Sequence, residues 1–253
     1  SPSFAYRGNP NLTWEKSNNF NVGFELGLFD RFDLEADFFI KETNDMLYAK
    51  PLPPSIGSPS WMYTNEMDMR NVGVEIELGA TIVKTRNVKW DVDLNLTTYK
   101  NSLTRLPSDK ADAIAEDGGY AVGGYWRSVG GSLYDFYDYH YLGVNAETGS
   151  PMYTVKNEDY NADDFNAVGG LEHGQLADGT YFVSQTSYAS RLETGKSALP
   201  NLYGGLSTNL DVYGFDLSVQ TVFQLGGYVD DSYYASLMHG GEYGQNWHKD
   251  IFK

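Results

Sequence analysis

The chain has 253 residues, and 34 acidic against 18 basic side chains give it a formal net charge of −16 at pH 7. An acidic surface repels a phosphate backbone, so nucleic acid is not an expected partner. The sequence holds no cysteine, which excludes a disulfide framework and any cysteine-ligated zinc or iron–sulfur site. No stretch approaches the roughly 18 consecutive apolar residues of a transmembrane helix, and the first residues lack the pattern of a signal peptide. The chain is therefore either soluble or crosses a membrane as strands.

The first regular pattern is an alternation of apolar and polar side chains over residues 18–29 and 32–41. The apolar residues of the first segment fall on one face: Phe20, Val22, Phe24, Leu26 and Leu28. The short link at Asp30 and Arg31 predicts an antiparallel hairpin. Residues 42–67 contain several prolines, which interrupt a strand ladder, so we expect a long loop there.

The same alternation returns over residues 70–83 and 88–100, joined by a short link at 85–87. It is clearest over residues 202–212 and 215–225, which flank a two-residue turn at Tyr213 and Gly214. Each of these last arms matches the roughly 9–11 residues that a tilted strand needs to cross a bilayer. The opposite faces carry carboxylates, amides and glycine, which suits a wet lumen on one side and lipid on the other.

Connection lengths predict the direction of the strands. In outer-membrane barrels the short turns lie on the periplasmic side and the long loops outside. The fourth predicted strand therefore exits outside and the strand at 202 enters from outside, so residues 101–200 must hold an even number of crossings. They contain no two-faced strand of crossing length. We expect zero crossings and a folded extracellular excursion with short hairpins of its own.

Four segments in this order carry a family resemblance: NPNLTWEKSNNFNVGFELGLFD, EMDMRNVGVEIELG, YLGVNAETGSPMY and LPNLYGGLSTNLDVYGFDLSVQTVFQLGGYVDD. The chain resembles the SusC/RagA-type TonB-dependent outer-membrane transporters of Bacteroidota over essentially its whole length. The resemblance implies an all-β fold, an antiparallel transmembrane barrel of about 22 strands. We expect residues 1–253 to supply about six of its crossing strands. The plug, the TonB box and the remaining strands would lie outside this sequence.

The resemblance also implies a function and partners. Such a transporter is a multi-pass barrel in the outer membrane, surrounded by lipid, that imports oligomeric glycans or peptides. A SusD-like surface lipoprotein closes its mouth, and TonB supplies energy through the N-terminal part. The alternative is a soluble, secreted all-β carbohydrate-binding module whose alternation reports one buried face. The position of the apolar faces, outward or interdigitated in a dry core, separates the two hypotheses.

The candidate substrate-binding residues are aromatic. The run at 134–141 could offer stacking platforms to a sugar or peptide, and so could tryptophans expected at the mouth; packing within the loop or against a partner is the favoured alternative. The candidates are Trp61, Trp126, Tyr134, Tyr137, Tyr139 and Tyr141. Acids on the polar strand faces could tune what passes, although a solvated wall needs polar residues in any case.

The sequence gives less support to a metal site or a catalytic site than to the aromatic binding residues. Asp159, Asn161 and Asp163 alternate as calcium ligands do, but the loop lacks the turn glycine and the closing glutamate, which favours a solvated acidic loop. The histidines are dispersed and no nucleophile motif is present, so we expect no enzyme activity and no cofactor. Residues 231–238 predict a short helix, capped by Asp230, Asp231 or Ser232 and stopped at 240–241, that packs on the mouth or the tyrosine-rich loop.

Overall fold

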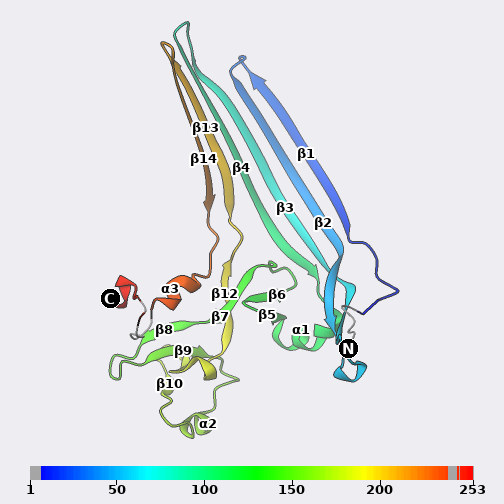
Figure 1. The fold of residues 1–253 in the computed structure, drawn as a ribbon, viewed down its shortest axis with the longest axis vertical. Coiled ribbons are helices and arrows are strands. Elements are labelled where there is room, and N and C mark those ends of the chain that lie inside the picture. The colour runs from blue at the N-terminus through cyan, green and yellow to red at the C-terminus, as the bar shows by residue number, and fades with distance from the viewer. Residues whose placement is uncertain (1–6, 239–243, 245, 253) are drawn as a thin grey trace.

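The computed structural model describes residues 7–238, 244 and 246–252, apart from the side chains of 251 and 252. Its largest element is one antiparallel sheet of six strands in the order β1-β2-β3-β4-β13-β14 (Figure 1). The strands are β1 (Lys16–Leu28), β2 (Phe32–Pro51), β3 (Trp61–Lys84), β4 (Val88–Arg105), β13 (Leu202–Val212) and β14 (Phe215–Leu225). The six predicted strands are confirmed. No helix among the described residues is long and apolar enough to span a membrane.

The three short connections lie together at one end of the sheet, and the longer segments lie at the other (Figure 1). The turn between β13 and β14 has φ of 48° at Tyr213 and 86° at Gly214, the left-handed pair that a two-residue hairpin with right-handed twist requires. This placement agrees with the predicted direction of the strands. It also puts β4 directly beside β13, as an excursion without crossings requires.

The long loop predicted over residues 42–67 is wrong. β2 continues to Pro51 and β3 begins at Trp61, so the hairpin extends well past β1, and only a short 3-10 helix (Pro54–Ile56) interrupts the connection. The prolines start at Pro51, where β2 ends. Before it the ladder continues across a bulge, with register shifts between Thr43 and Leu47 and a left-handed φ of 58° at Asp45.

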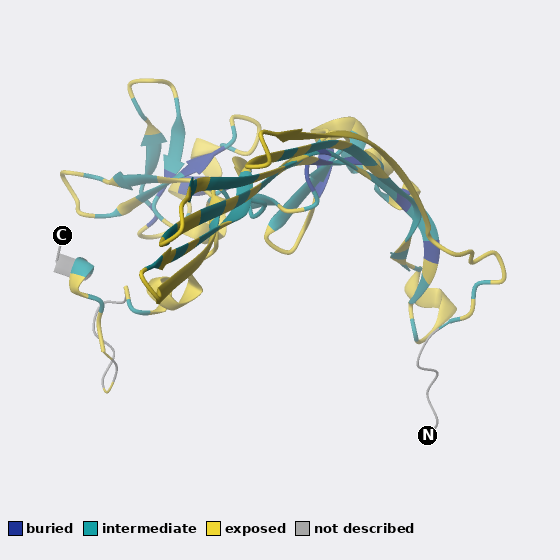
Figure 2. Ribbon diagram, turned by 90° about the horizontal axis from the view of Figure 1, so that it is seen from above, coloured by how far each residue is buried: buried dark blue, intermediate teal, exposed yellow. Residues whose placement is uncertain are grey.

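The two faces of the sheet differ as the alternation predicted. On β1 the five apolar residues from Phe20 to Leu28 are all at least 43% exposed, and Phe215 and Leu217 on β14 are similarly open. At the end away from the short turns this apolar band stops at a charged row, where Glu42 pairs with Arg70. The sheet is an arc when viewed along its strands, and it stays open to solvent instead of packing on a second sheet (Figure 2). The exposed apolar band fits a lipid-facing surface and not the dry core of a sandwich.

The opposite face is polar and acidic. Glu25, Glu35 and Glu77 lie directly opposite one another on β1, β2 and β3. A hollow of about 380 Å³ lies over this row. Like charges placed directly opposite destabilise a sheet unless water screens them, so this face suits a wet lumen.

β4 continues to Arg105, past the predicted strand end at Lys100, and the residues between Arg105 and Leu202 fold as an excursion beyond the ends of the six strands (Figure 1). They form two four-stranded sheets, β12-β7-β6-β5 and β10-β11-β9-β8, whose longest strand has seven residues. The strands are β5 (Gly119–Val122), β6 (Tyr125–Ser128), β7 (Asp135–Tyr139), β8 (Tyr141–Val144), β9 (Pro151–Val155), β10 (His173–Gln175), β11 (Tyr181–Val183) and β12 (Arg191–Ser197). The helices are η2 (Ser108–Lys110), α1 (Ala111–Asp117), α2 (Ala162–Asn166) and η3 (Thr186–Tyr188).

The segment after β14 contains the predicted short helix. It is α3 (Ser232–Ser236), and the Asp231 side chain caps it by accepting a hydrogen bond from the Tyr234 N–H at 2.8 Å. The Tyr234 ring meets the His248 ring edge to face at 4.8 Å, ahead of η4 (Lys249–Phe252). The predicted glycine stop at 240–241 lies outside the described residues.

The lipid-facing assignment predicts opposite tolerance at two adjacent residues of β14. Val219→Arg places a charge in the apolar band and should reduce the free energy of unfolding by about 2–4 kcal/mol near mid-membrane, whereas Gln220→Arg should cost far less. Reversible folding of the full-length protein into lipid vesicles measures both. Equal costs at the two positions would contradict the assignment.

A second matched pair tests the packing of the polar face. A Cβ added at Gly73 would lie 2.5 Å from the Thr98 carbonyl oxygen and 2.6 Å from the Phe39 ring, whereas at Gly79 its nearest neighbour is an Asp93 carboxylate oxygen at 3.5 Å. Backbone cannot shift cheaply, so Gly73→Ala should destabilise the sheet by about 1–3 kcal/mol. Gly79→Ala on the same strand face is the control. Denaturant titration that ranks the two variants equally would refute this account.

Candidate functional site

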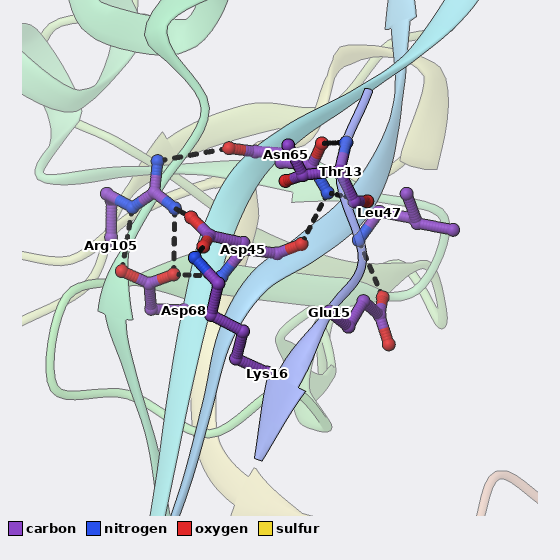
Figure 3. Close-up of polar contacts among 8 residues, drawn as sticks. All are labelled: Thr13, Glu15, Lys16, Asp45, Leu47, Asn65, Asp68 and Arg105. Atoms are coloured by element: carbon purple, nitrogen blue, oxygen red, sulfur yellow. Dashed lines mark hydrogen bonds and ion pairs between the residues drawn. The ribbon is translucent and has the colours of Figure 1, made fainter. Parts of the chain in front are cut away.

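A polar network centred on Arg105 joins the extended hairpin to β4 (Figure 3). Arg105 donates two hydrogen bonds to the Asp68 carboxylate, at 2.7 and 2.8 Å, and one to Asp45 at 3.2 Å. A further bond reaches the Asn65 carbonyl oxygen at 3.2 Å. The planar guanidinium matches a carboxylate with two parallel bonds, so the network fixes the bulge at Asp45 against the end of β4.

The segment before β1 is held to the same hairpin. Thr13 and Asn65 exchange hydrogen bonds: the Thr13 N–H donates to the Asn65 side chain at 2.8 Å, and the Asn65 amide donates back to Thr13 O at 3.0 Å. Glu15 accepts from the Leu47 N–H at 2.6 Å, and Lys16 pairs with Asp45 at 2.8 Å. These contacts continue the edge of β2 past the point where β1 stops pairing (Figure 3).

Two carboxylates at this end of the hairpin, Asp68 and Glu66, have lowered pKa values. Hydrogen bonding from Arg105 holds the pKa of Asp68 below its usual range, against a smaller opposing effect of burial. For Glu66, burial raises the pKa, but hydrogen bonds from Lys50 and Ser108 outweigh it and bring the value to about 2. A lowered folded-state pKa stabilises the protein above the unfolded-state pKa, and this stability is lost as pH falls through the folded-state value. The hairpin should therefore loosen only in strong acid.

The excursion has a small core of its own. Val155, Phe165, Leu171 and Val183 are buried together, and Tyr160 stacks on Tyr181 with ring centroids 4.1 Å apart. Phe165 comes from α2, and Val155 and Val183 come from β9 and β11. This core stabilises the sheet β10-β11-β9-β8, and so fixes the position of the side chains on its strands.

Two of the predicted binding residues are packed against each other. Trp126 on β6 stacks on Tyr137 on β7 at 4.8 Å, and the Arg191 guanidinium on β12 lies 4.9 Å from the centre of the same Tyr137 ring. The Arg191 guanidinium also donates to Gly123 O at 2.8 Å, in the turn between β5 and β6. These contacts within the sheet favour the packing interpretation for Tyr137 and Trp126.

Two other candidates also meet aromatic neighbours. Tyr134 makes an edge-to-face contact with Tyr125 at 5.9 Å, and Trp61, at the tip of the extended hairpin, makes one with Tyr63 at 5.1 Å. Trp61 belongs to β3, outside the excursion. The structure therefore does not bring all six predicted residues to one site. Their assignment to substrate stays a prediction.

Tyr139 and Tyr141 do come together, beside a hollow of about 380 Å³ that we call the tyrosine pocket. Its walls also carry Asp138 from β7 and Glu193 and Lys196 from β12. Both tyrosines are exposed, at 38% and 53%. Sequence reasoning missed the two β12 residues because they reach this wall only through the pairing of β12 with β7, whose register shifts between Glu193 and Ser197.

The acidic loop does not gather ligands. Asn161 caps α2 by accepting from the Asp163 N–H at 3.1 Å, and Asp159 accepts from the Ser190 hydroxyl at 2.6 Å. Across the part of the chain that the structure describes, no three His, Cys, Asp or Glu side chains are grouped as metal ligands. His173 is engaged by the Tyr160 hydroxyl at 2.9 Å, and His239 lies outside the described residues.

Comparison with known proteins decides the family. The model of the family described as "TonB dependent receptor-like, beta-barrel" matches residues 1–155. This chain belongs to the TonB-dependent receptors. It is thus part of an outer-membrane β-barrel, from a family of transporters and not of enzymes.

Relatives place it within the SusC/RagA type. The chain is 25% identical to TonB-dependent receptor P39 of Formosa agariphila over 89% of its own length and 23% of the relative. It is 28% identical to TonB-dependent receptor SusC of Bacteroides thetaiotaomicron over 57% of its length and 15% of the relative. The solved RagAB peptide importer in its closed-closed state matches with a TM-score of 0.76 and 26% identity, over 95% of this chain and 24% of that chain. This TonB-dependent receptor chain spans less than a quarter of each of these relatives.

The Arg105 network predicts unequal effects at two arginines of this TonB-dependent receptor. Arg105→Met leaves Asp68 and Asp45 without their donor and should cost about 1–3 kcal/mol, with faster hydrogen exchange at residues 9–16. Arg70→Met removes a more exposed pair with Glu42 and should cost less. Unfolding and exchange of the full-length receptor measure both, and a larger effect at Arg70 would contradict the assigned role.

Proposed function

We propose that this chain forms part of a TonB-dependent importer of oligomeric nutrients, peptides or glycans, that works with a SusD-like surface lipoprotein. The observation that carries the proposal is the likeness to the RagAB peptide importer over 95% of the chain. The relative named SusC supports the same transporter type. TonB would act through parts of the polypeptide beyond the six strands described above.

The proposal gives each part of the chain a role. The six strands form a segment of the barrel wall, with the apolar band toward lipid and the row of Glu25, Glu35 and Glu77 toward the lumen. Residues 101–200 lie at the extracellular mouth, where they contact substrate and the lipoprotein. The direction of the three short turns supports this placement, because short turns of such barrels face the periplasm.

Uptake by whole cells tests the proposal. Cells that produce the full-length receptor and its co-expressed lipoprotein should take up labelled peptides or oligosaccharides too large for passive diffusion. Deleting the receptor, the lipoprotein or TonB should each abolish uptake. Protease added to the same intact cells should cut within residues 101–200 once the lipoprotein is removed. Undiminished uptake without TonB would overturn the proposed function, and complete protection of 101–200 would overturn the placement.

A further inference from the structure

The tyrosine pocket carries unpaired charges of both signs. Among the described residues, Lys196 forms no ion pair, and neither Asp138 nor Glu193 has a basic partner. All three side chains are exposed and line the same hollow. A solvated surface explains one such charge. Here three of them, of both signs, line one cavity together with two exposed tyrosine rings.

The ammonium group of Lys196 is held in place. Its Nζ lies 5.0 Å from the centre of the Tyr228 ring, and Tyr228 is itself fixed by a hydrogen bond from its N–H to Ser197 O at 2.9 Å. A cation on a ring face keeps its outward N–H groups free to donate. The Asp138 carboxylate accepts one bond from the Tyr139 N–H at 2.7 Å, which orients it and leaves an oxygen open.

The hollow continues along the sheet. A second cavity of about 220 Å³ shares Asp138, Thr194 and Lys196 with the tyrosine pocket and is bounded on its far side by Tyr228 and Asp230. Lys196 therefore stands between the two spaces. An extended ligand can reach both, with the ammonium group of Lys196 near its middle.

We propose that the tyrosine pocket binds oligopeptides through their charged groups, with a peptide carboxylate on Lys196 and a peptide ammonium or guanidinium on Asp138 and Glu193. This rests on the proposed function and selects one of its two substrate classes. The volume of about 380 Å³ is in the range of ligand pockets, roughly 300–1,000 Å³. A neutral glycan would desolvate three charges without pairing them, and a site built for charged groups rejects a ligand that lacks them.

Binding to the purified full-length receptor tests the proposal with four probes. These are tetra-alanine with free termini, the same peptide N-acetylated, the same peptide C-amidated, and maltotetraose as a neutral oligomer. The free peptide should bind at least about tenfold more tightly than either capped peptide and than maltotetraose. Equal affinity for free and capped peptides, tighter binding of maltotetraose, or no binding of any probe would overturn the proposal.

Variants assign the charges. Lys196→Gln should remove the advantage of a free carboxylate and leave the amidated peptide unaffected, whereas Asp138→Asn with Glu193→Gln should remove the advantage of a free ammonium. Lys110→Gln is the matched control, because Lys110 also lies over a tyrosine ring, Tyr120 at 5.9 Å, but away from the pocket. If Lys196→Gln and Lys110→Gln behave alike, the pocket assignment fails. TonB-dependent uptake of a neutral glycan would then support the proposed transport function even though the pocket assignment had failed.

Discussion

Every peptide group of a membrane-crossing strand needs a hydrogen-bond partner within the protein, because lipid offers none. This requirement fixes the main features of the structure. The six long strands form one continuous antiparallel sheet, in which β4 pairs directly with β13 although the excursion separates them in sequence. Most of the irregular backbone lies beyond the apolar band, at the bulge around Asp45 and in the excursion, and one further register shift, between Thr81 and Val83, lies near the short turns. The connections at one end have only two or three residues, so each strand pairs with the next almost to its end.

The requirement acts on the side chains as well. The backbone hydrogen bonds are made within the sheet, so the side chains on its two faces can differ. Successive side chains point to opposite faces, and the alternating sequence therefore gives one apolar face and one polar face. The acidic row on the polar face is tolerated because water screens it. Beyond the band the backbone ladder of β2 and β3 continues to Pro51 and Trp61, and the two hydrogen bonds from Arg105 to Asp68 add a side-chain link from this hairpin to β4.

The strands could be read from the sequence because their signal is local. A period of two over eleven residues, ended by a turn such as Tyr213 and Gly214, has few other solutions, and both arms were placed residue for residue. The hairpin at 42–67 was not predicted, because its bulge breaks the period of two and because Arg105, which binds Asp68 and Asp45, comes from the distant β4. Only part of the tyrosine pocket could be predicted from the sequence. Its tyrosines stand in an aromatic run, whereas Lys196 joins them only through a register shift.

The excursion is, in topological terms, an insertion. The Thr98 hydroxyl donates to Asn201 O at 2.7 Å although the two residues are 103 positions apart in sequence, so the returning chain meets β4 again just before β13 begins. The entropic cost of closing such a loop grows only with the logarithm of its length. The six-stranded sheet therefore constrains only the distance between the two ends of the excursion, and not its length or its fold. Under the proposed function, recognition at the mouth can change through insertion, deletion and recombination in this segment while the barrel keeps its strands and their register.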